Sequence, residues 1–364
     1  MASPRSSRRE LGFRRSTLHL GRRRLELPHG EFEVHFFRDL ARNESAMAIV
    51  CGDLAGSDPI RARVHSSCLT SECLMGCDCD CAEQLDGALA TMARAGRGVL
   101  FYLMQEGRGA GLTAKARDRM IVQASGNRVT TFEAYAEMGL PPDLRRYDVV
   151  APMSRLLEIR APISLLTNNP EKAAGVSKIL AEEGLEVCRT EPIQGPTSIF
   201  NRDYLSAKHD SGHALDRPDR RVGARPPRPV SFVPPVVLPG DRNWILAASY
   251  FLPVELGGFA TAGAIDEMGG EAAIEWFRLS VLFDCETARE SIVLAHPGTP
   301  EPHRLRATLE ALESSRRVDM SLLDRLPMTS APGREALLAS LVEIRDTGEG
   351  AVHVHFEDRD RAER

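Results

Sequence analysis

The sequence predicts an α+β protein in two parts: a mixed β-sheet flanked by helices, and a second, smaller α+β domain. Two observations carry this prediction. Short apolar runs typical of strands alternate with segments of helical spacing, and a stretch rich in Arg and Pro interrupts this pattern after residue 215. The length of 364 residues agrees with two domains, because a single hydrophobic core stops growing near roughly 250–300 residues.

Helices and strands are expected to alternate in the first half of the chain. Helical spacing runs from Glu83 to Ala95, where Gly96 follows, and from Leu112 to Ala124. A third helix is expected from Lys172 to Glu183, because Gly184 supplies a C-terminal stop. Apolar or alternating runs predict strands at 32–37, 47–50, 62–65, 98–103 and 163–166.

The second half begins after a predicted linker. Residues 216–235 hold six prolines among several arginines, which favours a semi-extended segment. Residues 236–364 are expected to form the second domain, whose role no motif indicates. His353 and His355 lie on one face of its last strand, but without a third ligand we interpret them as exposed strand residues. Strands are expected at 243–252 and 351–356, and helices at 271–282, 301–316 and 333–346.

Composition excludes several classes of function. The formal net charge of -5 excludes a globally basic nucleic-acid binder. No stretch approaches the roughly 18 apolar residues that span a bilayer, so no membrane partner is expected. Residues 1–24 contain eight arginines and one acid, which predicts a disordered basic tail; an anion-binding segment or a transit peptide is the alternative. We expect a cytoplasmic location, because no apolar segment of a secretory signal follows this tail.

Five of the eight cysteines lie in one short stretch, at positions 68, 73, 77, 79 and 81. A disulfide framework would spread cysteines along the chain, so this clustering favours a metal site in a reducing compartment. Thiolates bind Zn²⁺ tightly, and a site with three protein ligands keeps a position open for water. Structural or redox thiols are the alternative, and the spacing alone does not identify the ligands.

Several motifs in a fixed order resemble the GTP cyclohydrolase II family. The segment 65–70 reads HSSCLT and is followed by the CDC triplet at 79–81. Further matches are QEGRG at 105–109, DLR at 143–145 and LLTNNP at 165–170. The resemblance covers about residues 25–215, which it identifies as a GTP cyclohydrolase II-like catalytic domain, and it leaves the C-terminal domain unassigned.

The resemblance implies a reaction and its cofactors. Family members open the imidazole ring of GTP and release formate and pyrophosphate, which gives 2,5-diamino-6-ribosylamino-pyrimidinone 5'-phosphate for riboflavin biosynthesis. By resemblance, Cys68, Cys79 and Cys81 hold one Zn²⁺ per chain, and Mg²⁺ accompanies the substrate phosphates. Cys73 and Cys77 are favoured as spare thiols over competing ligands. A homodimer is also implied.

Residue roles follow from the same resemblance. Asp143 matches the proposed general base, and Arg145 matches an arginine at the α-phosphate. Because a guanidinium stays protonated, electrostatic stabilisation is the safer interpretation of Arg145. Without the resemblance, these two residues could be an ordinary surface ion pair. The positions that match nucleotide contacts are Arg63, Val64, His65, Ser66, Ser67, Gln84, Glu106, Gly107, Arg108, Thr131, Thr167 and Lys172.

Four positions depart from the family pattern. Arg119 stands where the family has a catalytic tyrosine, and an arginine can donate a hydrogen bond but cannot accept one. Asp78 and Met104 replace arginines, and Ser67 replaces a glutamate. These departures predict a specialised paralogue that stops at the formamidopyrimidine or acts on another nucleotide. The alternatives are a related ring-opening hydrolase, similar to a uracil-degrading branch, and a non-catalytic nucleotide-binding module.

Overall fold

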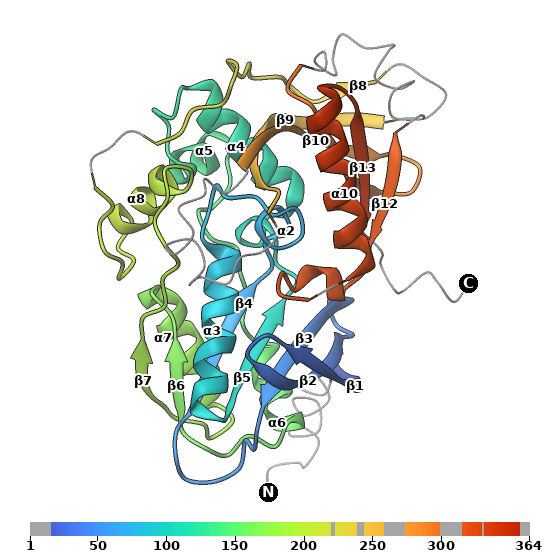
Figure 1. The fold of residues 1–364 in the computed structure, drawn as a ribbon. Coiled ribbons are helices and arrows are strands. Elements are labelled where there is room, and N and C mark those ends of the chain that lie inside the picture. The colour runs from blue at the N-terminus through green and yellow to red at the C-terminus, as the bar shows by residue number, and fades with distance from the viewer. Residues whose placement is uncertain are drawn as a thin grey trace, which may run out of the picture.

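Two β-sheets organise the chain (Figure 1). The computed structural model describes residues 16–219, 223–238, 244–257, 274–298, 315–329 and 331–356. A seven-stranded sheet has the order β1-β2-β3-β5-β4-β6-β7, and a six-stranded sheet has the order β12-β13-β11-β10-β9-β8. Both sheets mix parallel and antiparallel pairs, and both carry helices, which confirms the predicted α+β class in two parts.

The first sheet is antiparallel on one side and parallel on the other. Its first four strands in spatial order pair antiparallel, whereas β5, β4, β6 and β7 run parallel. The carboxyl ends of the parallel strands therefore meet at one edge of the sheet. The strands are β1 (Thr17–Leu27), β2 (Gly30–Asp39), β3 (Glu44–Cys51), β4 (Ile60–Ser66), β5 (Gly98–Leu103), β6 (Ile163–Leu166) and β7 (Val187–Glu191).

Helices cover both faces of this sheet and confirm the three helices predicted for this half of the chain. The apolar face of α3 (Cys81–Ala95) packs on one side, and α6 (Val150–Leu156) and α7 (Pro170–Ala181) pack on the other. Gly96 ends α3 with φ 69°, a left-handed conformation that glycine adopts without steric cost. The remaining helices of this part are α2 (Leu69–Glu72), α4 (Leu112–Ala124), α5 (Thr131–Glu137) and α8 (Arg202–Asp210), with a 3₁₀ turn at Gly107–Gly109.

The predicted boundary of the basic tail is wrong. Strand β1 begins at Thr17, inside the segment 1–24, and pairs with β2 from Thr17 opposite Asp39 to Leu27 opposite Gly30. Its arginines lie on a half-exposed hairpin, so the segment needs no core of its own to fold. Residues 1–15 of the predicted tail lie outside the described residues.

The second sheet corrects another prediction. The segment 271–282 was expected to be helical, but from Ile274 it forms a strand that pairs antiparallel with β9 and β11. The predicted helix at 301–316 lies outside the described residues up to 314, and a strand begins at Arg316. The elements are β8 (Val236–Val237), β9 (Trp244–Glu255), β10 (Ile274–Asp284), β11 (Arg289–Ala295), β12 (Arg316–Met320), α10 (Pro332–Thr347) and β13 (Ala351–Phe356).

One hydrophobic core joins the second sheet to the first part of the chain. Leu69 and Leu74 beside α2, and Leu112 and Met120 on α4, belong to the same buried cluster as the inner residues of β9 and β10. In Figure 1, α4 lies next to β9 and β10, and α10 lies across the second sheet. We therefore propose that the predicted division at residues 216–235 separates two parts of the chain that fold against each other. Within the described ranges, each helix is too short or too polar to span a bilayer.

Candidate active site

Segments that follow three parallel strands converge at the carboxyl edge of the first sheet. Ser67 and Cys68 follow β4, the segment 105–109 follows β5, and Thr167 follows β6. These residues line two adjoining pockets, each with a cavity of about 80–90 Å³. Arg145 and Tyr204 line both pockets, so the two cavities adjoin.

Three thiols lie together in one of these two pockets, which we call the metal pocket. The Sγ atoms of Cys68, Cys79 and Cys81 all lie within 4.8 Å of one another, and those of Cys68 and Cys79 are 3.6 Å apart. Sulfurs at about 2.3 Å from a tetrahedral Zn²⁺ lie ~3.8 Å apart, so this cluster fits the ion. Cys68 precedes α2 and Cys81 begins α3, so two helix starts position the set.

The other two cysteines of the stretch do not belong to this cluster. Cys73 lies in the shared hydrophobic core, where burial raises the pKa of its thiol to about 12. The Cys77 thiol donates to the Met75 carbonyl at 3.6 Å, and burial raises its pKa above the ordinary value. Neither sulfur belongs to the cluster of three, so these positions agree with spare thiols.

A buried lysine that was not among the predicted site residues connects the thiols to Glu106. Lys115 Nζ lies 2.9 Å from Cys68 Sγ and 2.9 Å from Glu106 Oε1. Hydrogen bonds from Cys79 and Cys81, together with the Lys115 ammonium, hold the pKa of Cys68 well below its usual value. The sequence could have indicated Lys115, because the helix predicted at 112–124 carries this charged residue among its buried positions.

Cations dominate the second pocket, which we call the anion pocket. None of its described lining residues is acidic. Burial, together with the charges of Arg145 and Arg63, lowers the pKa of Lys172 well below its usual value. Such a concentration of positive charge is stable when an anion shares the pocket. The basic residues of the lining are Arg63, His65, Arg108, Arg145, Lys172, Lys208 and His213.

Arg145 is fixed by Asp143. The Arg145 Nε donates to both carboxylate oxygens of Asp143, at 2.9 and 3.1 Å, and the Arg145 amide also donates to Oδ1 at 3.0 Å. Burial alone would raise the pKa of Asp143, but the hydrogen bonds from Arg145 outweigh it and lower this pKa. Asp143 itself lines neither pocket, so in this structure it is a positioning partner of Arg145.

A buried chain of polar side chains connects the anion pocket to helix α2. Arg63 Nε donates to His65 Nδ1 at 3.2 Å, and His65 Nε2 lies 2.7 Å from Glu72 Oε1. Tyr102 donates to the same carboxylate. Because Nδ1 accepts from Arg63, the Nε2 atom carries the proton and donates to Glu72. This chain fixes α2, which follows Cys68, against strand β4.

The structure brings nearly all of the predicted contacts into these two pockets. The exceptions are Asp143 and Val64, whose carbonyl accepts from Lys172 Nζ at 3.2 Å while its side chain packs in the core. The hydroxyls of Ser66 and Ser67 are buried without a hydrogen-bond partner among the described residues. The predicted residues that line one or both pockets are Arg63, His65, Ser66, Ser67, Gln84, Glu106, Gly107, Arg108, Arg119, Thr131, Arg145, Thr167 and Lys172.

Two of the departures from the family pattern form one ion pair. Arg119 Nε lies 3.1 Å from Asp78 Oδ2, and both residues retain only 8% exposure. The Arg119 guanidinium also lies 4.7 Å from the centre of the Tyr204 ring. Asp78 thus neutralises Arg119 at the wall of the metal pocket.

Strand β9 binds the segment that connects the metal ligands. The Cys77 amide donates to the Pro253 carbonyl at 2.9 Å, and the Glu255 amide donates to the Met75 carbonyl at 3.0 Å. On α4, the Gln123 side chain makes two hydrogen bonds with the main chain of Phe251, at 2.7 and 2.9 Å. The second sheet therefore fixes both the cysteine loop and the helix that carries Lys115 and Arg119.

Glu255→Pro should loosen this attachment, because proline removes the amide that binds the Met75 carbonyl. One lost hydrogen bond corresponds to roughly 1 kcal/mol, so we expect release of bound Zn²⁺ to a chelator to accelerate about fivefold. Glu255→Ala keeps the amide and is the matched control. Equal release rates in the two variants would show that this contact does not hold the metal loop.

Comparisons with known proteins identify the domain. Residues 19–192 match the family model described as GTP cyclohydrolase II. The curated GTP cyclohydrolase-2 proteins of Shewanella amazonensis and Shewanella sediminis are each 37% identical over 193 residues, which cover 53% of this chain and 90% of each relative. The chain belongs to the GTP cyclohydrolase II family.

This family match stops at residue 192, before the second sheet begins. A solved two-domain 3,4-dihydroxy-2-butanone 4-phosphate synthase from A. baumannii matches with a TM-score of 0.27 and 16% identity, covering 50% of this chain and 41% of that chain. A likeness this loose carries no argument.

Proposed function

We propose that the chain is a zinc-dependent hydrolase that opens the imidazole ring of GTP. The observation that carries this proposal is the cluster of three thiols in a pocket that adjoins one lined by cations and no described acid. The family match and the 37% identity to GTP cyclohydrolase-2 proteins support GTP as the substrate.

The metal pocket would take the base. Cys68, Cys79 and Cys81 would hold Zn²⁺, which when bound lowers the pKa of a coordinated water and polarises substrate oxygens. Glu106 lies beside this cluster, and its carboxylate accepts from the Leu69 and Gly107 amides and from Lys115, which leaves one acceptor position for an N–H donor of a guanine edge. Lys115 balances the negative charge of Cys68 and Glu106.

The anion pocket would take the triphosphate with its Mg²⁺. Arg63, Lys172 and Lys208 line the pocket as phosphate partners, and Arg145 is held in a fixed orientation by Asp143. A preorganised guanidinium stabilises the charge that develops during phosphoryl transfer, so Arg145 would assist pyrophosphate release. The proposed enzyme would be a homodimer.

Arg119 would limit the extent of the reaction. Its guanidinium is bound by Asp78 and cannot supply the hydroxyl that relays a proton, because arginine only donates. We therefore expect the ring-opened formamidopyrimidine to accumulate, with little formate released per GTP consumed. A formate assay alongside GTP consumption checks this, and abundant stoichiometric formate would show that Arg119 imposes no such limit.

The function is tested by mass spectrometry of the products from GTP and Mg²⁺, alongside a zinc count. We expect GTP to be consumed at about one Zn²⁺ per chain. UTP in a parallel incubation is the control for the base. Unchanged GTP at full zinc occupancy would refute the proposal. Selective conversion of UTP would instead show that the chain is the related ring-opening hydrolase that acts on another base.

Substrate binding should take up a proton through Lys172. Burial and neighbouring cations lower its pKa in the free site, and a bound phosphate would raise this pKa again. GTP affinity is therefore greatest below the free-state pKa and falls as the pH rises through it. Calorimetry in buffers of different ionisation enthalpy measures the uptake, which Lys172→Met should abolish. The same uptake in that variant would assign the proton to another group.

A further inference from the structure

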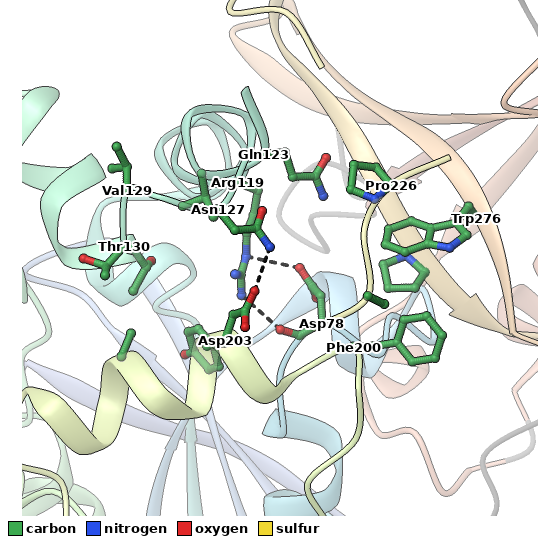
Figure 2. A pocket seen from close by; sticks show the side chains of 16 residues that line it. Asp78, Arg119, Gln123, Asn127, Val129, Thr130, Phe200, Asp203, Pro226 and Trp276 are labelled. Atoms are coloured by element: carbon green, nitrogen blue, oxygen red, sulfur yellow. Dashed lines mark hydrogen bonds and ion pairs between the residues drawn. The ribbon is translucent and has the colours of Figure 1, made fainter. Parts of the chain in front are cut away.

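A third pocket adjoins the metal pocket and is built by both parts of the chain (Figure 2). Its cavity is about 90 Å³. Arg119, Thr131 and Tyr204 line it and also line the metal pocket, so these side chains separate the two cavities. The other walls come from α4, α8, the segment 224–226, β9 and β10. We call this cavity the junction pocket.

One wall of the junction pocket is apolar and aromatic. Trp276 on β10 and Phe200 before α8 pack edge to face, with ring centres 5.9 Å apart. Pro226 and Pro253 complete this wall, and Figure 2 shows Trp276, Phe200 and Pro226 grouped on one side of the pocket. An aromatic face can bind a planar ring by stacking, and the proline rings add apolar contact area.

The opposite wall offers hydrogen-bond acceptors. Asp78 is 8% exposed; its Oδ2 faces Arg119, whereas its Oδ1 is buried and has no hydrogen-bond donor among the described residues. Asp203 also lines the pocket, and its Oδ2 accepts from Asn127 Nδ2 at 2.8 Å. An unpaired buried acceptor costs free energy, so a ligand that donates to Asp78 Oδ1 would be favoured.

We propose that the junction pocket binds a planar, single-ring heterocycle that carries amino or N–H donors. The ring stacks on Trp276, and one of its donors binds Asp78 Oδ1. A cavity near 90 Å³ suits a single ring rather than a whole nucleotide. The pyrimidine ring of the product that the proposed reaction would form has this chemistry, while its ribosyl phosphate would lie outside the cavity; only that connection rests on the proposed function.

The test uses the full-length zinc-loaded chain with Trp244→Phe, which leaves Trp276 as its single tryptophan. We expect 2,4-diaminopyrimidine to quench Trp276 fluorescence in a saturable way. The analogue 2,4-dimethoxypyrimidine has the same ring without donors and should bind at least about tenfold more weakly. Absence of saturable quenching, or equal affinity for both compounds, would overturn the proposal.

Two further variants locate the binding site. In Asp78→Asn the amide oxygen should face Arg119, which only donates, so an NH₂ group would replace the free acceptor and weaken binding at least about tenfold. Ala207→Leu should fill the pocket from α8 and abolish quenching, whereas Ser206→Leu, one position away and outside the lining, should not. Circular dichroism checks the fold of each variant. Unchanged binding in Ala207→Leu would overturn the assignment, and no readout depends on GTP turnover.

Discussion

Cys79→Ala should reduce bound zinc from about one per chain to about a tenth or less, and should slow GTP consumption at least about thousandfold. The reason is geometric: Cys79 supplies one of three sulfurs within 4.8 Å of one another, and two thiolates cannot complete a site that already keeps one position open. Metal analysis and a timed assay of GTP consumption measure both effects.

Cys77→Ala is the matched control for this prediction. Cys77 is two positions away, but its thiol donates to a carbonyl and lies outside the cluster. We expect this variant to keep its zinc and its rate of GTP consumption. If Cys77→Ala loses the metal while Cys79→Ala keeps it, the ligand set derived from the structure is wrong.

Lys172→Met should weaken GTP binding about 10- to 100-fold. Charge-assisted hydrogen bonds are worth roughly 1.5–3 kcal/mol, which corresponds to this range of affinity. Lys172 lines the anion pocket, and its helix begins at the edge of the sheet where the phosphates would lie. Equilibrium binding of GTP to the zinc-loaded protein gives the affinity.

Two comparisons distinguish a phosphate contact from general damage. Lys178→Met lies on the exposed side of the same helix and should leave GTP binding unchanged. Guanosine has no phosphates, so its affinity should be equal in the Lys172 variant and the unmodified chain. A matching loss of guanosine binding would mean that Lys172 supports the fold of the pocket rather than the phosphates.

The site was predictable from sequence where residues lie close together in a motif. Cys68 follows a predicted strand, and Cys79 and Cys81 precede a predicted helix in the same short stretch. The segments after β4, β5 and β6 meet because parallel strands end at one edge of the sheet. The ion pair between Asp78 and Arg119 was not predictable, since 41 positions separate two residues that the sequence shows only as departures.

The fold prediction failed where the apolar residues of a short segment fit both the helical period and the strand period. The segment 271–282 has apolar residues at helical spacing, but Phe277, Leu279 and Val281 also alternate, and pairing with β9 and β11 on both sides decides for a strand. Strand β1 was missed because its arginines obscure the alternation. The attachment of β9 to the cysteine loop uses main-chain groups, which leave no sequence signal.

The central claim is that three sulfurs hold one ion and leave a position free of protein sulfur. X-ray absorption at the zinc edge of the purified, zinc-loaded protein tests it directly. We predict three sulfur neighbours and one oxygen or nitrogen neighbour. Four sulfur neighbours, with Cys73 or Cys77 recruited to close the site, would contradict the account.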